Sequence, residues 1–307
     1  MPLRTAFFGT SDFAAIVLRA LAASPYKPAL VVTPPDRPKG RGRRLQSPPA
    51  AIVARGVGIE LVQAEGVNDA GPMDAIHAAE LDVGIVCAFG QLLREPLLSE
   101  LEMLNIHPSL LPRWRGAAPI ERAIMEGDSE TGVTIMRVTE GLDSGPVALQ
   151  RAVAIEPGEA FDSLSARLAE LGAVLVLEAL ELRSRDQLRL EPQDDEEATY
   201  AEKISPEERH LDPGLPAIDL ERRVRALTPH VGAYLELDGG QRLGVREARA
   251  VEIGGDPEPG RLVAIGDELR LACGHGALRL LHVLPPGGRE MEAGAYLRGH
   301  DPPERAL

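Results

Sequence analysis

The chain has 307 residues, 44% of them hydrophobic and 26% charged, which is ordinary for a globular protein and long enough for about two domains. A formal net charge of −14 argues against indiscriminate binding to nucleic acid, and the only cysteines, Cys87 and Cys273, exclude a disulfide framework and a cysteine metal site. No apolar run approaches about 20 residues, so neither a membrane span nor a signal peptide is expected, and a cytoplasmic location is the default.

The first half of the chain alternates short apolar runs with helix-like segments. Residues 3–8 predict a buried strand, followed by a helix over 12–22 that Ser11 or Asp12 caps. This alternation is typical of parallel βαβ units and predicts an α/β fold: a Rossmann-like open, mostly parallel sheet with helices on both faces. The turn after the first strand lacks the G-x-G-x-x-G spacing, so no dinucleotide site is predicted. Further strands are predicted at residues 29–32, 59–62, 83–86 and 104–107.

A basic segment follows the second of these strands. Residues 34–44 read Pro-Pro-Asp-Arg-Pro-Lys-Gly-Arg-Gly-Arg-Arg, so five cations stand among prolines and glycines. That composition predicts an extended loop, neither helix nor strand. A run of charge is usually a solvated surface, but this one follows a strand at the edge of the sheet where ligands bind. We therefore expect contacts to a polyanionic substrate from Arg37, Lys39, Arg41, Arg43 and Arg44.

The strand at residues 104–107 carries the most informative pattern. Asn105 and His107 are two residues apart and therefore point to the same face of the strand. Farther along, Asp143 stands in Gly-Leu-Asp-Ser-Gly. Transfer of an acyl group to an amine needs an imidazole to relay the proton, a carboxylate to orient the imidazole and an amide to stabilise the oxyanion. Taken alone, these residues also permit a structural reading, in which His107 caps a strand end and Asn105 forms a turn.

The rest of the chain predicts the end of the sheet and a second domain. Residues 133–138 and 147–155 predict a closing strand pair around Asp143, and 161–185 a long helix that packs on the sheet. The acidic stretch 190–209 predicts a linker without a binding role. We therefore expect a catalytic domain over 1–189, this linker, and a C-terminal domain over 210–307.

The C-terminal domain is expected to be a small β-barrel. A helix over 218–227 is followed by short β-like runs joined by turns rich in Gly, Asp and Pro. Asp238-Gly239-Gly240 predicts a hairpin between the first two runs. This pattern fits a barrel of the oligonucleotide-binding (OB) type, with strands at 233–237, 242–251, 260–265, 268–272 and 277–283.

A set of ordered motifs resembles those of a known family. Asn-Ile-His at 105–107 continues as Pro-Ser-Leu-Leu-Pro-Arg-Trp-Arg-Gly-Ala-Ala-Pro-Ile to residue 120. Glu-Thr-Gly-Val-Thr-Ile-Met at 130–136 and Gly-Leu-Asp-Ser-Gly at 141–145 follow. Together with Phe-Gly-Thr-Ser-Asp-Phe at 8–13 and Tyr-Ala-Glu-Lys-Ile at 200–204, this order resembles the folate-dependent formyltransferases over nearly the whole chain, and among them those acting on methionyl initiator tRNA.

The resemblance implies a reaction and roles for residues. The reaction is transfer of a formyl group from 10-formyltetrahydrofolate to the α-amino group of methionyl initiator tRNA. Independently of the resemblance, we expect a monomer, and no metal site is predicted because the histidines lack ligand spacing. Asn105, His107 and Asp143 match the catalytic trio, and residues 37–44 match a basic insertion that engages the tRNA acceptor end. The positions implied to contact the folate are Ser109, Leu110, Leu111, Pro112, Phe89, Gly90, Leu92, Val138 and Gly141.

Alternatives with the same trio stay open. One is a formyltransferase acting on a small amine, and another is a hydrolase that releases formate from the same folate. The barrel and the basic segment favour RNA, because a small acceptor needs neither; a non-enzymatic RNA-binding protein is disfavoured by the intact trio. The chain departs from the family at residues 228–234, where an aromatic-rich stretch is replaced by Thr-Pro-His-Val-Gly-Ala-Tyr, so a stacking contact there is in doubt. The other histidines show no ligand spacing.

Overall fold

The computed structural model describes residues 2–39, 44–252, 254, 258–301 and 303–307. Within these, the chain forms two compact units. The first comprises Met1–Gly116, Thr131–Ala154 and Ser165–Ala201; the second comprises Ala117–Glu130, Ile155–Leu164 and Glu202–Leu307. The domain boundaries expected from the sequence stay a prediction.

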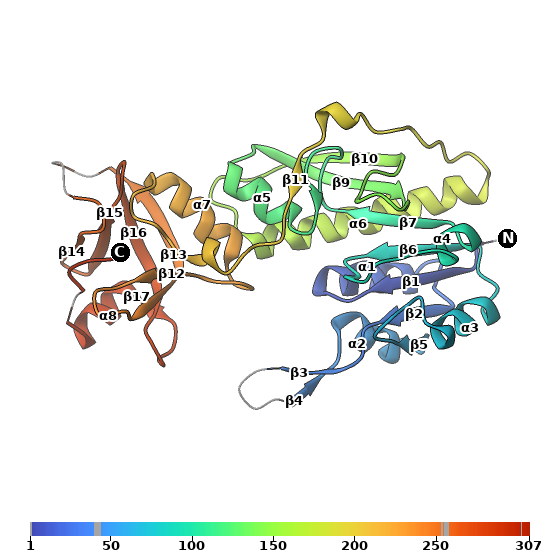
Figure 1. Ribbon diagram of the computed structural model, residues 1–307, viewed down its shortest axis with the longest axis horizontal. Helices are drawn as coiled ribbons and strands as arrows, with labels where there is room; N and C mark the ends of the chain where they lie inside the picture. The colour runs from blue at the N-terminus through green and yellow to red at the C-terminus, as the bar shows by residue number, and fades with distance from the viewer. Residues whose placement is uncertain (1, 40–43, 253, 255–257, 302) are drawn as a thin grey trace. The chain divides into compact units, whose positions relative to one another are not determined.

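The first unit is built on a seven-stranded sheet in the order β10-β9-β7-β6-β1-β2-β5 (Figure 1). Strands β1, β2, β5, β6 and β7 pair in parallel, and β9 runs antiparallel to β7. From β1 the chain first adds β2 and β5 on one side, and then adds β6, β7, β9 and β10 on the other side. The direction in which strands are added therefore reverses between β1 and β6. The bounds are β1 (Thr5–Gly9), β2 (Leu30–Thr33), β5 (Glu60–Gln63), β6 (Val83–Cys87), β7 (Met103–His107), β9 (Glu130–Arg137) and β10 (Val147–Ala154).

Helices cover both faces of this sheet, as predicted. Phe8, Val86 and Asn105 are in register on β1, β6 and β7, so they share one face. On that face Phe8 and Val86 pack in a cluster with side chains of α3 and α4. Ile106 points to the opposite face, against which α6 packs closely at Gly172. A Cβ added to Gly172 would lie 2.8 Å from Cγ2 of Ile106. The helices are α1 (Asp12–Ala22), α2 (Pro49–Gly56), α3 (Ala70–Ala78), α4 (Leu97–Glu100) and α6 (Phe161–Ser184).

The expectation that the basic segment is neither helix nor strand is wrong. Strands β3 (Arg37–Lys39) and β4 (Arg44–Gln46) form an antiparallel hairpin. Proline is tolerated because this ribbon has only two strands and its outer edges face solvent. The base of the hairpin is fixed by Asp36, whose carboxylate accepts hydrogen bonds from Gln63 Nε2 and Ser47 Oγ, both at 2.8 Å. These bonds, that from Gln63 above all, lower the pKa of Asp36.

The stretch expected to be a linker is ordered against the first unit up to Ala201. It contains the short helix η1 (Asp195–Glu197) and strand β11 (Tyr200–Ala201). Strand β11 pairs in parallel with β8 (Arg115–Gly116), which lies just beyond the catalytic-motif loop. The rest of the stretch, including η2 (Glu207–Arg209), belongs to the second unit.

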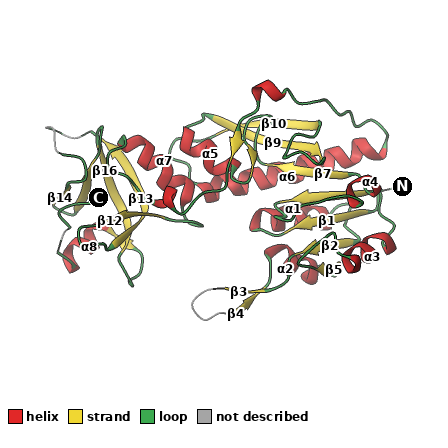
Figure 2. Ribbon diagram, viewed as in Figure 1, coloured by secondary structure: helices red, strands yellow, loops and turns green. Residues whose placement is uncertain are grey.

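The second unit is an antiparallel β-structure with a lead-in helix (Figure 2). Its strands are ordered β12-β13-β16-β15-β14, and β17 pairs with β16. The predicted hairpin at Asp238-Gly239-Gly240 is confirmed, because β12 and β13 are antiparallel neighbours. The bounds are α5 (Pro119–Glu126), α7 (Ala217–Leu227), β12 (Ala233–Glu236), β13 (Arg242–Val251), β14 (Leu262–Ile265), β15 (Glu268–Ala272), β16 (Ala277–Leu284), β17 (Met291–Glu292) and α8 (Ala293–Gly299).

The last residues of the chain join the two edge strands of this sheet. Ala306 bridges Leu237 at the end of β12, and Arg305 bridges Arg261 just before β14. The backbone N–H of Leu262 donates to the Glu304 carbonyl at 2.8 Å. The edges of an open sheet are therefore bridged by residues 304–307, which is the closure that a small barrel requires.

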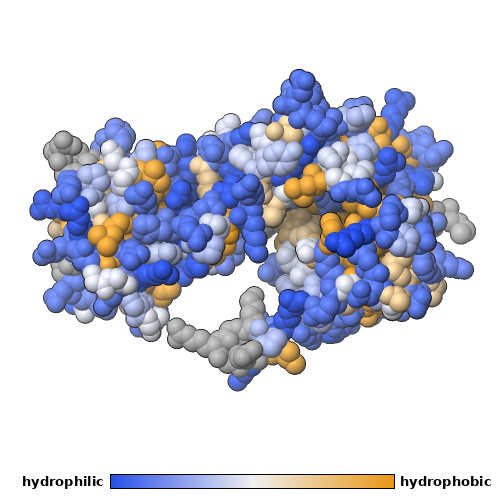
Figure 3. Space-filling model, in the orientation of Figure 1, coloured by the Kyte–Doolittle hydropathy of each residue, from blue (hydrophilic) through white to orange (hydrophobic). Residues whose placement is uncertain are grey.

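The surface is predominantly polar. On the face drawn in Figure 3, hydrophobic residues are scattered among hydrophilic ones. Single exposed hydrophobic residues are ordinary on globular proteins. None of the described helices is both long enough and apolar enough to cross a bilayer.

Candidate active site

The three predicted catalytic residues come from two neighbouring parts of the first unit. Asn105 and His107 lie on β7 and point to the same face, as predicted. Asp143 lies in the loop that connects β9 to β10, and β9 is the antiparallel neighbour of β7. The structure brings His107 and Asp143 together, with 3.6 Å between Nδ1 and Oδ2. His107 stands at the carboxyl end of a strand, where open α/β sheets place their ligands.

His107 is almost wholly buried, with 4% of its side chain exposed. Its Nε2 lies 2.9 Å from the Trp114 carbonyl oxygen. Because a carbonyl can only accept, Nε2 carries the hydrogen and Nδ1 is the position that can gain or lose a proton. Burial lowers the pKa of His107, while Asp143 and the Trp114 carbonyl oppose that shift. The imidazole is therefore neutral near pH 7, with the Nδ1 lone pair directed toward the Asp143 side.

Asp143 is fixed by backbone contacts. Its Oδ2, the atom that faces His107, accepts a hydrogen bond from the Gly116 N–H at 2.9 Å. Its own backbone has φ +47°, in the left-handed region that Asp tolerates better than most residues. Gly116 has φ +121°, and a Cβ there would lie 2.7 Å from the Ala201 carbonyl oxygen. Glycine is thus required for the donor that holds Asp143.

Asn105 completes the trio on the same strand. It is the one residue of β7 that is half-buried and not fully buried. Its register partners are Val86 on β6 and Met136 on β9. The amide therefore stands on the face of His107, two residues before it, between apolar neighbours.

The segment Ser109–Pro112 is held rigidly beside the trio. Thr134, opposite His107 on β9, donates its hydroxyl to the Ser109 carbonyl at 2.7 Å and accepts from the Leu111 N–H at 3.1 Å. The Ser109 hydroxyl is itself committed to the Arg113 carbonyl at 2.6 Å. Ser109 is therefore a structural anchor of the loop in this structure, while Leu110 and Pro112 are half-buried.

The loop after β6 leaves its backbone exposed at two positions. Ala88 and Gly90 both have positive φ, +46° and +76°, and both are exposed. Between them Phe89 is buried, with its ring edge-on to Phe8 at a centroid distance of 5.7 Å. The buried ring anchors the loop, and the main chain on either side stays accessible. Leu92, farther along the same loop, is 63% exposed.

The remaining predicted folate positions lie beyond β9. Val138 is half-buried, donates its N–H to the Met103 carbonyl at 2.8 Å and packs against the core cluster of the first unit. Gly141 is exposed two residues before Asp143. Both lie in the loop that carries Asp143.

The basic residues lie on the hairpin. Arg37 is largely exposed on β3 and pairs with Glu65 at 2.5 Å. Arg44 is exposed on β4, and Lys39 is the last residue of β3. Arg41 and Arg43 lie outside the described residues.

Sequence reasoning missed the groups that hold the trio in place. The Trp114 carbonyl and the Gly116 N–H are main-chain groups, which no side-chain pattern reveals. Gln193 was also missed, because it stands in an acidic stretch that reads as a linker. Its Nε2 donates to the carbonyls of Asp143 and Gly145, at 2.8 and 2.7 Å. The repeated glycines around Asp143 were the only signal that this loop needs close support.

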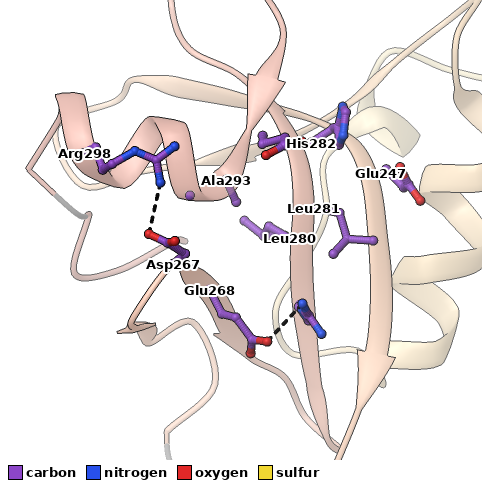
Figure 4. Close-up of a pocket in the computed structure, with 11 residues that line it drawn as sticks. Glu247, Asp267, Glu268, Leu280, Leu281, His282, Ala293 and Arg298 are labelled. Carbon is purple, nitrogen blue, oxygen red and sulfur yellow. Dashed lines mark hydrogen bonds and ion pairs between the residues drawn. The ribbon is translucent and has the colours of Figure 1, made fainter.

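A pocket of about 320 Å³ lies in the second unit, among β13, β15, β16 and α8 (Figure 4). Its two arginines are engaged: Arg298 lies 3.1 Å from Asp267, and Arg279 lies 3.0 Å from Glu268. Carboxylates outnumber cations on its wall, so it does not suit a phosphate-bearing ligand. Across the described part of the chain, no cluster of three or more His, Cys, Asp or Glu residues could hold a metal ion.

The region that departs from the family pattern forms local contacts in the second unit. The His230 ring stacks on Phe161 at a centroid distance of 3.7 Å, and its Nε2 lies 2.9 Å from Glu121 Oε1. This histidine is thus held by local contacts with Phe161 and Glu121.

Comparisons with known proteins agree over both units. Residues 3–180 match the formyl transferase family, and residues 203–301 match the formyl transferase C-terminal domain. The methionyl-tRNA formyltransferase of Methylococcus capsulatus is 43% identical over 300 residues, which cover 97% of each chain. That of Halorhodospira halophila is also 43% identical, over 304 residues and 97% of each chain.

Solved structures share the fold at low identity. HypX from Aquifex aeolicus, in complex with tetrahydrofolic acid, has a TM-score of 0.66 and 19% identity over 97% of this chain and 47% of its own. The sugar 3N-formyl transferase WlaRD, with dTDP and 5-N-formyl-THF, has a TM-score of 0.66 and 15% identity over 91% of this chain and 97% of its own. The full-length identity and the two matched domains lead to one conclusion: this chain belongs to the formyl transferase family, among the methionyl-tRNA formyltransferases.

Proposed function

We propose that the protein transfers a formyl group from 10-formyltetrahydrofolate to the α-amino group of methionine esterified to initiator tRNA. The observation that carries the chemistry is the pair of buried His107 and half-buried Asp143 at a strand end, with 3.6 Å between Nδ1 and Oδ2. His107 Nε2 lies 2.9 Å from the Trp114 carbonyl oxygen, and Asp143 Oδ2 accepts a hydrogen bond from the Gly116 N–H. The choice of acceptor is supported by the full-length relatives, which are named methionyl-tRNA formyltransferases. Because tRNA charging and translation take place in the cytoplasm, we place the enzyme there, acting as a monomer.

His107 is the proton acceptor in this proposal. An attacking amine becomes cationic when it bonds to the formyl carbon and must then lose a proton. The Nδ1 lone pair of the neutral imidazole takes that proton, since Nε2 is occupied with the Trp114 carbonyl. The imidazolium so formed faces Asp143, whose negative charge favours it. The proton then passes to the N10 nitrogen of the folate as the C–N10 bond breaks, giving formylmethionyl-tRNA and tetrahydrofolate.

Asn105 is the group that stabilises the developing negative charge. The formyl oxygen gains charge when the carbon becomes tetrahedral, and an amide N–H aimed at it lowers the barrier. Asn105 is half-buried and lies on the same strand and the same face as His107. The strand fixes the spacing of the two residues, so the amide and the imidazole can act on the same formyl carbon. No serine or cysteine nucleophile is needed because the amine attacks directly. Loss of such a donor typically costs about 10²–10³ in kcat.

The folate is proposed to lie against the strand ends of β6 and β7. The exposed main chain at Ala88 and Gly90 suits a heterocycle that hydrogen-bonds with backbone groups, because no side chain stands in its way. Leu92 offers apolar surface on the same loop, and Gly141 leaves space on the loop of Asp143. The segment Ser109–Pro112 and Val138 are proposed as further walls.

The β3–β4 hairpin is proposed to contact the tRNA backbone. Arginine donates planar, bidentate hydrogen bonds to phosphates, and Arg37 and Arg44 are exposed on this ribbon. In the sequence, Arg41 and Arg43 stand between the two strands of the hairpin, and Lys39 adds a further cation. Against a net charge of −14, this concentration of cations gives a local site for a polyanion.

The test offers 10-formyltetrahydrofolate to the purified protein with charged initiator tRNA, with a small amine such as an amino sugar, or with neither. We expect rapid N-formylation of the tRNA-bound methionine and little reaction in the other two arms. Formylation of the small amine at equal kcat/KM would favour the alternative of a small-molecule formyltransferase, and release of formate without an acceptor would favour a hydrolase. Failure in all three arms overturns the proposal.

A further inference from the structure

The segment 191–201, here named the strap, contacts both loops that hold the catalytic pair. At one end Glu191 and Val147 exchange two backbone hydrogen bonds, at 2.8 and 2.9 Å, next to the Asp143 loop. At the other end Thr199 Oγ1 accepts from the Trp114 N–H at 2.9 Å, and its carbonyl accepts from the Arg115 N–H at 2.8 Å. The strap thus joins the loop of Asp143 to the segment that supplies the backbone partners of His107 and Asp143.

Gln193 is the side chain that links these two loops in the middle of the strap. Its Nε2 donates to the carbonyl oxygens of Asp143 and Gly145. Its Oε1 accepts from Arg115, at 3.1 Å from Nε and 2.9 Å from Nη2. A glutamine amide has two N–H donors and two acceptor lone pairs, so all four positions are used. Gln193 is also half-buried, while its neighbours Pro192 and Asp194 are exposed.

The surroundings allow only one orientation of this amide. Turned over, it would direct its oxygen at two carbonyls and its NH₂ at the Arg115 guanidinium. Arg115 is itself buried, with 4% of its side chain exposed, and its Nη2 also pairs with Asp195 at 2.8 Å. The buried guanidinium of Arg115 is held in one position because both Gln193 and Asp195 accept charge-assisted hydrogen bonds from it. Gln193 therefore connects the main chain of Asp143 to the immobile side chain of Arg115.

We propose that Gln193 is a positioning residue, which sets the Asp143 carboxylate against His107 by joining the Asp143 loop to Arg115. The main chain of Asp143 is in a left-handed conformation that needs support from its surroundings. Gln193 holds its carbonyl, while the Gly116 N–H holds its carboxylate. This inference rests on the proposed function, since it assigns Gln193 an effect on formyl transfer through Asp143.

The decisive variant is Gln193→Glu. It preserves the length of the side chain and the acceptor for Arg115, so the buried cation keeps its partner and the fold is expected to persist. It replaces the donor to the Asp143 and Gly145 carbonyls with a negative oxygen, which repels them. We expect kcat to fall about tenfold or more, because small displacements of catalytic groups are costly, while KM for tRNA and for folate changes less than about twofold. Glu197→Gln, an exposed change of charge on the same strap, is the matched control and should retain wild-type kcat.

A readout that does not depend on turnover is the titration of His107 followed by NMR. The described groups that face this imidazole are the Asp143 carboxylate and the Trp114 carbonyl, and both raise its pKa. This readout uses Gln193→Met, because the new carboxylate of Gln193→Glu would itself raise the pKa of His107. If Asp143 moves away in Gln193→Met, the titration midpoint of His107 falls below that of the wild type. A midpoint that is unchanged, together with unchanged kcat, overturns the proposal.

A double-mutant cycle separates positioning from a general structural effect. If Gln193 acts through Asp143, then Gln193→Glu combined with Asp143→Asn should be no slower than Asp143→Asn alone. Multiplicative losses would overturn the proposal. Should Gln193→Glu fail to fold, Gln193→Met, uncharged and of similar length, takes its place in the cycle. A wild-type protein that formylates no tRNA refutes the proposed function, whereas an active wild type matched by Gln193→Glu refutes only this inference.

Discussion

His107 combines two properties that usually conflict. It is buried, which disfavours its charged form, and it stands beside a carboxylate, which favours it. Burial is the larger influence, so the resting imidazole is neutral and can accept a proton. The negative charge of Asp143 stabilises the imidazolium, which exists only after His107 has accepted the proton. The pair therefore stabilises the state that forms during the reaction more than the state before it.

Removing the imidazole should abolish proton transfer with little effect on donor binding. We expect His107→Ala to lower kcat by about a hundredfold or more, since general base catalysis contributes about 10²–10⁴. Single-turnover kinetics with charged tRNA would measure the rate, and fluorescence titration would measure folate binding. His77→Ala, an exposed histidine on α3, is the matched control. Turnover of His107→Ala at the wild-type rate would contradict the assignment.

The protonation of His107 should be visible directly. Because burial lowers its pKa, we expect an NMR titration midpoint below the ordinary value of about 6.5. Asp143→Asn removes an influence that raises the pKa, so the midpoint in that variant should be lower still. The unfolded chain then binds a proton at higher pH than the folded chain, so this residue makes the fold less stable as pH falls below about 6.5. A wild-type midpoint above about 7 would contradict this reading.

At the scale of elements, the sequence predicted those with a regular apolar period. The helix over 12–22, its Ser11 cap and the strands over 242–251 and 268–272 match the structure residue for residue. The other predicted strands agree to within three residues at their ends. In these elements the spacing of apolar residues along the sequence matches the set of residues that are buried, so the pattern indicates both the type of element and its buried face. The pairing of His107 with Asp143 was also predicted, from the need of the imidazole for a carboxylate partner and from the family resemblance, and their side chains lie 3.6 Å apart.

What the sequence could not reveal lies in contacts between distant segments. The β3–β4 hairpin was missed because proline and glycine argue locally for a loop, while Asp36 fixes its base through residues 11 and 27 positions away. The ordering of the strap was missed because an acidic, polar stretch reads as solvated. Its position depends on Gln193 and on β11 meeting β8, contacts that no local pattern encodes.

The β8–β11 contact predicts a sharp requirement for glycine. Gly116→Ala would place a Cβ against the Ala201 carbonyl and force alanine into φ +121°. We expect it to destabilise the fold by about 1–3 kcal/mol and to lower kcat, because the donor to Asp143 moves. Urea unfolding and initial rates would measure both effects. Gly71→Ala, in α3 with open space around its Cβ position, is the control and should not destabilise.

At the scale of the whole molecule, an acidic protein must attract an acidic substrate. The net charge of −14 repels RNA at a distance, so binding depends on locally concentrated cations. Such binding releases counterions and weakens as salt rises. The dependence of KM on ionic strength therefore reports how many cations touch phosphate.

Replacing Arg41, Arg43 and Arg44 with alanine should raise KM for tRNA and flatten its salt dependence. Each lost phosphate contact should reduce the slope of log KM against log salt by about one. Steady-state kinetics between low and physiological salt would measure the slope, and KM for folate should stay constant.

The control for that experiment removes equal charge elsewhere in the first unit. Arg19, Arg94 and Arg185 are exposed and lie away from the hairpin in the sequence. Their replacement with alanine should leave the slope close to that of the wild type. Equal slopes for both triple variants would show that the hairpin makes no privileged contact with tRNA.

The bridging of β12 and β14 by residues 304–307 has a consequence for how the second unit meets other molecules. An edge strand carries backbone N–H and C=O groups that can pair with a strand of another chain. Because residues 304–307 already occupy some of these groups on both edges, the same segment that joins the edges also protects them against edge-to-edge aggregation.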